Sequence, residues 1–444
     1  MKKLLIAVLL VAVMAVPAFA SVQNVKVSGD LQTTWAVRDT FDFTDTGDQV
    51  NQNLNDVISY ARVRIDADLT DNVSTTVRLL NERAWGDDTS GSANADVELD
   101  LAYVQLREML YSPLTVTLGR QELFYGNGFI IGGNGPNNNT YTGSPLAENG
   151  LRDLSMRNSL DAVKAVLNYD PLTIDMFAAV VDSNDTVLQA EKNDDVNLYG
   201  INANYKFSDK WNTIAEGYFF SKYDHKADGE KKDTIYVPGM RLSTNPIKGL
   251  NLQGELAWQR GNQSPLVGTR GEREAVAGQF IAGYLLPFEK TAKYQPVVSY
   301  AFTYASGDDN YASGEVKGWD PMYEHLSGGK IYNAILNFTN VSCHELALSV
   351  KPVEDITLKG SWSMLYMNED LNTTLNISSP MGASAYPANG KKDLGDEIDL
   401  DLTYAYTEDV SIGMSAGWFF PGEAFERNGD RTATQLLTSL SVAF

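Results

Sequence analysis

The stretch ATQLLTSLSVAF, residues 433–444, closes the chain and carries the pattern on which the fold prediction depends. Its side chains alternate, with Leu436, Leu440, Val442 and Phe444 on one side and Gln435, Ser439 and Ser441 on the other. A period of two residues is typical of a β-strand with one apolar and one polar face. The chain therefore ends inside a predicted strand, and that strand needs a partner for its backbone groups.

The same alternation recurs along the chain. In 57–69, Val57, Val63 and Ile65 alternate with Arg62 and Arg64, and segments 201–207 and 398–406 repeat the pattern. After residue 20 no run of about 18 apolar residues occurs, which excludes helical membrane spans. A mean hydropathy of −0.24 is compatible with a membrane β-barrel, because only one face of each strand touches lipid.

These patterns predict an all-β fold, a transmembrane antiparallel up-and-down β-barrel of about 18 strands. Short connections follow the even-numbered strands, whereas the connections 125–159, 307–341 and 369–395 are long. Outer-membrane barrels have short periplasmic turns and long extracellular loops, and a soluble β-sandwich or propeller, the alternative, has no reason to sort its loops. The predicted strands are 25–38, 57–69, 73–83, 97–108, 114–124, 160–169, 172–182, 196–207, 211–222, 234–244, 250–262, 274–286, 295–306, 342–352, 355–368, 396–407, 410–420 and 433–444.

The amino-terminal segment predicts export. Lys2 and Lys3 precede an apolar run over 4–16, and Ala18-Phe19-Ala20 has the small residues of a cleavage site. We therefore predict a signal peptide at 1–20 and one outer-membrane β-barrel at 21–444. The alternative of an uncleaved anchor requires a longer apolar run.

Charge and cysteine content narrow the function classes. The net charge of −22 becomes −24 when Lys2 and Lys3 are removed, so nucleic acid is not a predicted partner. Cys343 is the single cysteine, so no disulfide within the chain is possible. In the bacterial outer membrane, the expected partners are membrane lipid, lipopolysaccharide and the barrel-insertion machinery.

The terminal Phe444 fits a barrel in two ways. In a closed barrel the last strand pairs with the first, which leaves no edge exposed to lipid. A final aromatic residue also resembles the carboxy-terminal signature of bacterial outer-membrane proteins, which implies that insertion machinery reads Phe444. An ordinary edge strand that ends in phenylalanine is the alternative.

Two stretches carry a family resemblance. LTVTLGRQELFYGNGFIIGG (114–133) and LGDEIDLDLTYAYTEDVSIGMSAGWFFPG (394–422) resemble barrel strands of the bacterial alginate-export family of outer-membrane proteins, most specifically at 119–121, 125–126 and 420–422. The resemblance implies about eighteen strands and a channel, in a family whose members serve several substrates. Where the family continues with an acidic residue and an arginine, this chain has Asn127-Gly128-Phe129, so one expected basic group is missing.

Strand parity turns charged side chains toward the predicted lumen. The candidate pore-lining residues are Arg62, Arg64, Arg78, Lys164, Lys206, Arg241, Asp399 and Asp401, together with further acidic residues. A basic sector that faces an acidic one would suit a channel selecting solutes by charge. Alternatively, these charges neutralise each other along a hydrated wall.

Arg120 conflicts with the parity rule. It shares parity with Leu114, Val116 and Leu118, which would face it toward lipid at a cost of about 2–4 kcal/mol near the midplane. A bulge at Gly119, or a position at the outer rim, would relieve that cost. Because the family resemblance favours an inward Arg120, we include it among the candidate pore-lining residues.

The loop GNGFIIGGNGPNNNTYTG (126–143) is rich in glycine and asparagine, and either enters the lumen as a constriction or stays outside it. The three histidines, His225, His325 and His344, are not at a metal-ligand spacing, and no catalytic motif is present. We therefore predict no enzyme activity, no cofactor and no metal.

Together these features predict an outer-membrane channel or porin for passive diffusion of hydrophilic solutes, with anionic sugars or oligosaccharides as candidate cargo. An alginate-type export channel for anionic polysaccharide is an alternative within the same class. From another class, a barrel scaffold that holds a partner protein would have a wider interior without a loop constriction.

Overall fold

The computed structural model describes residues 24–43, 53–86, 97–132, 151–182, 196–225, 233–263, 271–288, 292–309, 314–326, 330–370, 375–379, 382–386, 389–425 and 431–444. The predicted signal peptide, residues 1–20, lies outside the described residues. No helix in the described part of the chain is long and apolar enough to cross a membrane.

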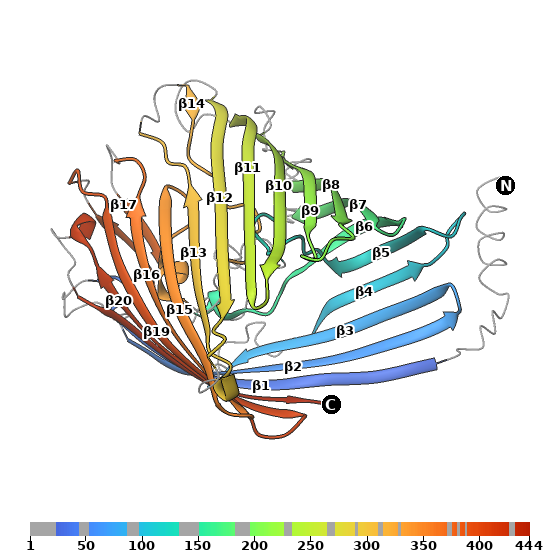
Figure 1. Ribbon diagram of the computed structural model, residues 1–444, viewed down its shortest axis with the longest axis horizontal. Coiled ribbons are helices and arrows are strands. Elements are labelled where there is room, and N and C mark those ends of the chain that lie inside the picture. Colours follow the sequence, from blue (N-terminus) through green and yellow to red (C-terminus); the bar gives the residue numbers. More distant parts are fainter. Residues whose placement is uncertain are drawn as a thin grey trace, which may run out of the picture.

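Most of the described strands form one antiparallel wall that closes on itself, and two others pair with each other in a separate small sheet (Figure 1). Leaving out the short β14, the 19-stranded sheet contributes 18 strands to this wall, which confirms the predicted fold class. The wall strands are β1 (Asn24–Asp39), β2 (Asn53–Thr70), β3 (Val73–Ala84), β4 (Glu98–Leu106), β5 (Leu114–Glu122), β6 (Ser159–Asn168), β7 (Leu172–Asp182), β8 (Val196–Lys206), β9 (Ile214–Asp224), β10 (Asp233–Ile247), β11 (Leu250–Gln263), β12 (Gly271–Leu285), β13 (Val297–Ala305), β15 (Val341–Val353), β16 (Ile356–Met367), β19 (Asp393–Ala405), β20 (Val410–Pro421) and β21 (Ala433–Ala443).

The first and last strands close the barrel. Their register runs from the pair Asp30–Ala443 to the pair Asp39–Thr434. Beyond it, the Gly29 N–H donates to the Phe444 carbonyl at 2.8 Å, and the Phe444 N–H donates back at 2.9 Å. Because lipid offers no partner for a free strand edge, this pairing explains why the chain ends in a strand.

Gly29 lies between the neighbouring strand β2 and the terminal Phe444, with little space around it. A Cβ at this position would lie 2.6 Å from the Arg62 carbonyl oxygen and 2.6 Å from the Phe444 ring. We expect Gly29→Val to lower the free energy of unfolding by about 1–3 kcal/mol, because overpacking displaces backbone. A urea titration of the refolded protein measures this effect. Gly217→Val is the matched control, since nothing lies within 4 Å of a Cβ there, and equal midpoints for both variants would contradict the expectation.

The wall has an apolar outer face and a mainly polar inner face, as the alternation predicts. Along β2, Val63 and Ile65 are both 42% exposed, and they pair with Gly29 and Val27 of β1 on the same face. Along β19, Ile398 and Leu400 are exposed, whereas Asp399 between them is buried. A row of exposed apolar side chains on the outside is the surface that a membrane-spanning strand presents to lipid.

The connections differ in length at the two ends of the barrel, as predicted. Short turns follow β2, β10, β15 and β19, whereas the connections after β5, β13 and β16 are long. The long connections contain elements that the alternation did not predict. These are η1 (Arg152–Leu154), β14 (Glu315–Val316), α2 (Ile331–Ile335), β17 (Leu375–Ser379), β18 (Gly382–Tyr386) and η4 (Glu423–Phe425), and η3 (Ala292–Tyr294) lies in a turn.

One strand boundary differs from the prediction for a local reason. Strand β9 begins at Ile214, not at residue 211. The Asp209 carboxylate accepts the backbone N–H groups of Trp211 and Thr213, each at 3.0 Å, and so closes a turn there. Hydrogen bonds from Thr213 hold the pKa of Asp209 below its usual value. An aspartate turn of this kind competes with the strand ladder.

Candidate functional site

Two long connections turn back into the barrel. We call residues 123–132, after β5, inner loop A, and the described residues 314–326 and 330–340, after β13, inner loop B. They meet as a short parallel pairing of Ile131 with Tyr323, in which the Tyr323 N–H donates to the Ile130 carbonyl at 3.0 Å. The His325 N–H also donates to the Gly128 carbonyl at 2.8 Å. The amino-terminal part of the glycine-rich loop therefore enters the lumen, and residues 133–143 lie outside the described residues.

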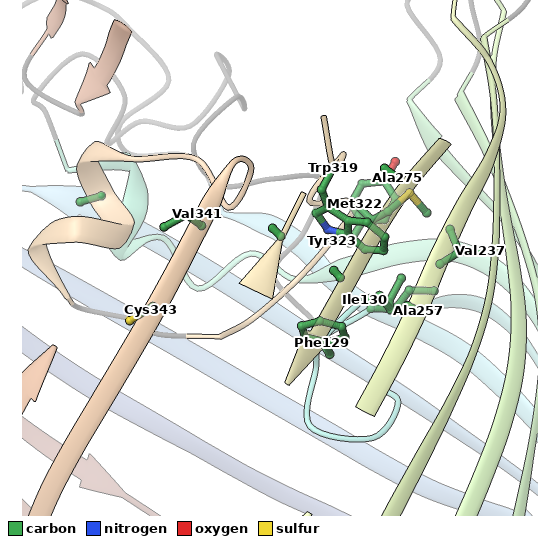
Figure 2. Packing of buried hydrophobic residues seen from close by; sticks show 14 of the residues in the cluster. Phe129, Ile130, Val237, Ala257, Ala275, Trp319, Met322, Tyr323, Val341 and Cys343 are labelled. Atoms are coloured by element: carbon green, nitrogen blue, oxygen red, sulfur yellow. The ribbon is translucent and has the colours of Figure 1, made fainter. Parts of the chain in front are cut away.

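An apolar cluster fixes the two inner loops to each other. Figure 2 shows Phe129 and Ile130 of inner loop A close to Trp319, Met322 and Tyr323 of inner loop B. All five side chains are almost fully buried, and the Phe129 and Trp319 rings stack with centroids 6.4 Å apart. Full burial of one such side chain stabilises a fold by about 1.5–3 kcal/mol. The cluster therefore holds the two loops together as a packed constriction.

Arg241 of β10 ties inner loop A to the wall. Its guanidinium forms an ion pair with Glu216 of β9 and donates to the side-chain oxygens of Asn127 at 3.0 Å and Gln253 at 2.7 Å. Glu255 of β11 lies 4.0 Å from the Arg241 Nε. Since Glu216 and Glu255 are both buried, Arg241 compensates their charge as well as holding the loop.

Asp320 ties inner loop B to the same wall segment. Its backbone N–H donates to the Gln259 side chain at 2.9 Å, and the Gln259 amide donates to the Asp320 carbonyl at 2.7 Å. Burial opposes the charged form of Asp320, but Lys222, Arg273 and the Met322 N–H together hold its pKa below the usual value. Burial also lowers the pKa of His325, which favours its neutral form at the junction of the loops.

The helix α2 of inner loop B is held by acidic residues of β19. The Glu397 carboxylate accepts the N–H groups of Ile331 at 2.8 Å and Tyr332 at 2.6 Å, at the start of the helix. The Lys330 ammonium lies 2.7 Å from Asp399. Burial opposes the charged form of Lys330, but Asp399 and other nearby carboxylates raise its pKa overall. Asp399 therefore serves as an anchor for the loop.

A third inward segment, residues 151–158, lies against the first strands. Asp153 pairs with Arg38 of β1 at 2.6 Å, and Arg157 pairs with Glu98 of β4 at 2.5 Å. The Tyr60 hydroxyl donates to the Leu154 carbonyl at 2.8 Å. This segment therefore lies against a different part of the wall from inner loops A and B.

The predicted arginines of β2 and β3 lie together on the inner face. Arg64 and Arg78 are direct cross-strand neighbours. Arg64 pairs with Asp66 at 2.7 Å, and Arg78 pairs with both Asp100 and Glu122. The Arg64 side chain is still 38% exposed, so it is accessible from the lumen although it has a partner. Its neighbour Arg62 pairs with Asp30 of β1 at 3.0 Å.

The predicted pore-lining lysines, Lys164 and Lys206, differ from these arginines in the groups that surround their charge. The Lys164 ammonium lies 5.6 Å from the centroid of the Tyr125 ring of inner loop A. Among the described residues, no carboxylate lies within ion-pair distance of Lys164 or Lys206. Lys206 is exposed at the end of β8, next to the turn that leads to β9. Asp401 of β19 accepts the Ser415 hydroxyl at 2.7 Å and faces Lys359 across the strand pair.

The pairing does not bring Arg120 to this basic group. Arg120 pairs with Ala102 and Asp161 without a register shift, on the face of the exposed Leu118, and its Nε donates to the Ser159 hydroxyl at 3.3 Å. Gly119 has a φ of +124°, and a Cβ there would lie 2.2 Å from the Ala102 carbonyl oxygen, so glycine absorbs the distortion without a bulge. Glu122, which shares the parity of Arg120, forms an ion pair with Arg78 of the inner face, so the inward position of Arg120 stays a prediction. Its position near the end of β5 corresponds to the outer rim.

Several site residues were not foreseen from the sequence. Asn127, Gln253, Gln259, Asp320 and Lys330 hold the inner loops, although nothing in the local pattern distinguishes them from exposed polar residues. Strand parity is the signal that could have found two of them. Gln253 and Gln259 lie an even number of residues from Glu255 on the same strand, so they share its inner face. Loop residues carry no such periodicity.

The closed wall, its apolar outer face and the sorting of its connections define a class of protein. The molecule is a transmembrane β-barrel of the bacterial outer membrane, surrounded by membrane lipid and narrowed inside by its own loops. The chain belongs to the alginate export family, which matches residues 23–439.

Solved structures have the same fold at low sequence identity. The outer-membrane protein OpdK of Pseudomonas aeruginosa has a TM-score of 0.57 at 12% identity, over 95% of this chain and 100% of that chain. OccK2 (OpdF) of the same organism, in complex with glucuronate, has a TM-score of 0.56 at 12% identity, over 95% and 99%. A BenF-like porin from Pseudomonas fluorescens Pf-5 has 0.56 at 11%, over 95% and 100%. A search of curated proteins found no match.

Proposed function

We propose that this barrel passes small hydrophilic solutes down their concentration gradient and prefers anionic ones. The observation that carries the proposal is the pair of neighbouring arginines, Arg64 and Arg78, on the inner face of β2 and β3, with Arg64 accessible from the lumen. Asp66 accepts the parallel hydrogen bonds from the Nε and Nη2 atoms of Arg64, so a passing carboxylate would bind through Nη1, which favours it over a neutral solute. Lys164 adds a positive charge without an ion-pair partner among the described residues.

Two solved relatives support an anionic cargo. OpdK has been crystallised with vanillate, and OccK2 with glucuronate. Both molecules are small ring compounds that carry one carboxylate at neutral pH. We infer a cargo of this size and charge, because the packed inner loops leave less room than an open barrel of the same strand number.

The parts of the barrel have separate roles in this proposal. The apolar outer face holds the wall in lipid, and the polar inner face keeps the lumen hydrated. The inner loops narrow the path, so that a solute passes close to the wall charges. On the inner face of the wall, Arg64 and Lys164 attract anions, whereas Asp66 limits how tightly an anion is held and so permits release.

Charge reversal at Arg64 tests the preference for anions. We expect Arg64→Glu to lower the anion-to-cation permeability ratio about 30-fold, because two charge units at about 7 Å in water raise an anion's energy and lower a cation's energy by about 1 kcal/mol each. The zero-current potential across a planar bilayer in a salt gradient measures this ratio. Lys391→Glu is the control, because it changes the charge by the same amount but lies outside the wall, in the connection between β18 and β19. An unchanged potential for Arg64→Glu would rule out Arg64 as a selectivity residue.

Export of an anionic polysaccharide is the second candidate, and family membership favours it. A polymer must thread the same path. If the barrel exports polysaccharide, oligouronates should block the ion current reversibly. If it passes small solutes, single uronates should block the current and oligouronates should not. A scaffold that holds a partner protein is less well supported, because the inner loops occupy space that a partner would need.

Further parts of the proposal concern biogenesis and surroundings. We propose that residues 1–20 are removed on export, that insertion machinery reads Phe444, and that lipopolysaccharide contacts the outer rim. We also infer that the barrel is a channel and not an enzyme. In the described residues, no group of three or more His, Cys, Asp or Glu side chains is arranged to hold a metal ion.

A further inference from the structure

A side pocket of about 230 Å³ lies between inner loop B and the wall. Its wall side is formed by strands β12, β13, β15 and β16, and its other side by Leu326 and the segment from Tyr332 to Phe338. Figure 2 shows Val341 and Cys343, which line it, on one strand. The volume is below the range of about 300–1,000 Å³ of drug-sized sites, which restricts an occupant to a small solute.

Apolar and polar side chains both line the pocket. Leu336 and Phe338 present apolar surface from inner loop B, with the polar Asn337 between them. The wall presents the polar side chains of Gln279 and Glu345 among apolar ones. The lining therefore offers apolar contact for the face of a ring and hydrogen-bonding groups for its hydroxyls.

Gln279 supplies the most specific feature. Its amide nitrogen donates to the Thr303 hydroxyl at 3.4 Å, while its amide oxygen is buried and has no hydrogen-bond partner among the described residues. A buried acceptor without a partner is unfavourable, so a ligand hydroxyl placed there gains a bond that the empty pocket lacks.

Charge around the pocket disfavours an anion. Among the described residues that line it there is no lysine or arginine, and the one charged side chain is Glu345, whose carboxylate lies 3.5 Å from the Lys359 ammonium. The pocket therefore has a preference opposite to that of the arginine pair on β2 and β3.

We propose that this pocket is a binding site for an uncharged single-ring solute that carries hydroxyl groups. The ring packs against Leu336 and Phe338, and one hydroxyl donates to the Gln279 amide oxygen. This site goes beyond the proposed passage of anions, because it selects neutral donors and because its occupancy does not depend on conduction.

Cys343 makes the proposal testable in the unmodified chain, since it is the single cysteine and lines the pocket. The rate at which a small methanethiosulfonate reagent modifies Cys343 in the refolded protein is measured with myo-inositol, with glucuronate and without solute. We expect myo-inositol to slow modification about tenfold at about ten times its Kd, by mass action, and glucuronate to have little effect. Equal protection by glucuronate, no protection by myo-inositol, or no reaction of Cys343 at all would overturn the proposal.

Two variants separate binding from a general change in the barrel. Gln279→Leu keeps the approximate volume and removes the acceptor, so protection by myo-inositol should be lost while the rate without solute is retained. Gln32→Leu, the same change on β1, should keep full protection. Protection that survives in Gln279→Leu would contradict the assigned role of the amide. Ion current, measured separately, reports on the proposed channel, so failure of one proposal is distinguishable from failure of the other.

Discussion

Replacing Arg241 with alanine is expected to lower the free energy of unfolding by about 3–5 kcal/mol, because it leaves buried carboxylates without their cation. Glu216 and Glu255 are both buried beside Arg241, and Asn127 loses its hydrogen bond to the wall. Release of inner loop A should also raise the single-channel conductance. Urea titration of the refolded protein measures the first effect, and planar-bilayer recording measures the second.

The controls for Arg241 separate charge from geometry. Arg260→Ala removes an exposed arginine of the neighbouring strand β11 and should change stability by about 0.5 kcal/mol or less. Arg241→Lys keeps the charge but not the planar donor group, so its stability should lie between those of the wild type and Arg241→Ala. Wild-type stability and wild-type conductance in Arg241→Ala would show that inner loop A is held by other contacts.

Truncation of Phe129 has the second large expected effect. Phe129 is fully buried and packs against Trp319 and Phe338, with ring centroids at 6.4 Å and 5.9 Å. Phe129→Ala should lower the free energy of unfolding by about 3–5 kcal/mol, because the packed loops can fill the cavity only in part. The loosened constriction should also give a noisier open-channel current, recorded under the same conditions as the wild type.

Phe124 provides the matched control for Phe129, since it lies in the same loop and is 52% exposed. Phe124→Ala creates no cavity inside the barrel, so the urea midpoint should change far less and the current noise should stay at the wild-type level. If the two variants were equally destabilised, the cluster between the inner loops would not be the element that fixes them.

The wall could be predicted closely because its two faces meet different solvents. Lipid on one side and water on the other impose a period of two on every strand, which is why Val63, Ile65, Ile398 and Leu400 indicated the outer face correctly. Strand ends were predicted less closely, since local hydrogen bonds decide them, as at Asp209 before β9. Closure was predictable because a strand at the end of the chain requires a partner.

The interior could not be predicted in the same way. The contact of Asn127 with Gln253 joins residues 126 positions apart, and no periodicity in a loop encodes such a pairing. Parity identified charged residues on the inner face, including Arg64 and Asp399, but not their partners. Thus Asp399 anchors Lys330 of inner loop B, an arrangement that depends on how the loop folds. At Arg120 the strand register continues without a shift, and the inward position that the family resemblance favours stays a prediction.

The central claim is that the barrel contains a continuous hydrated path narrowed by inner loops A and B. Single-channel recording of the refolded protein in a planar bilayer tests it most directly. A steady, stepwise conductance with anion preference, raised in Arg241→Ala, is the expected result. Absence of any conductance from protein that is folded and inserted would contradict the claim, because the inner loops would then close the barrel completely.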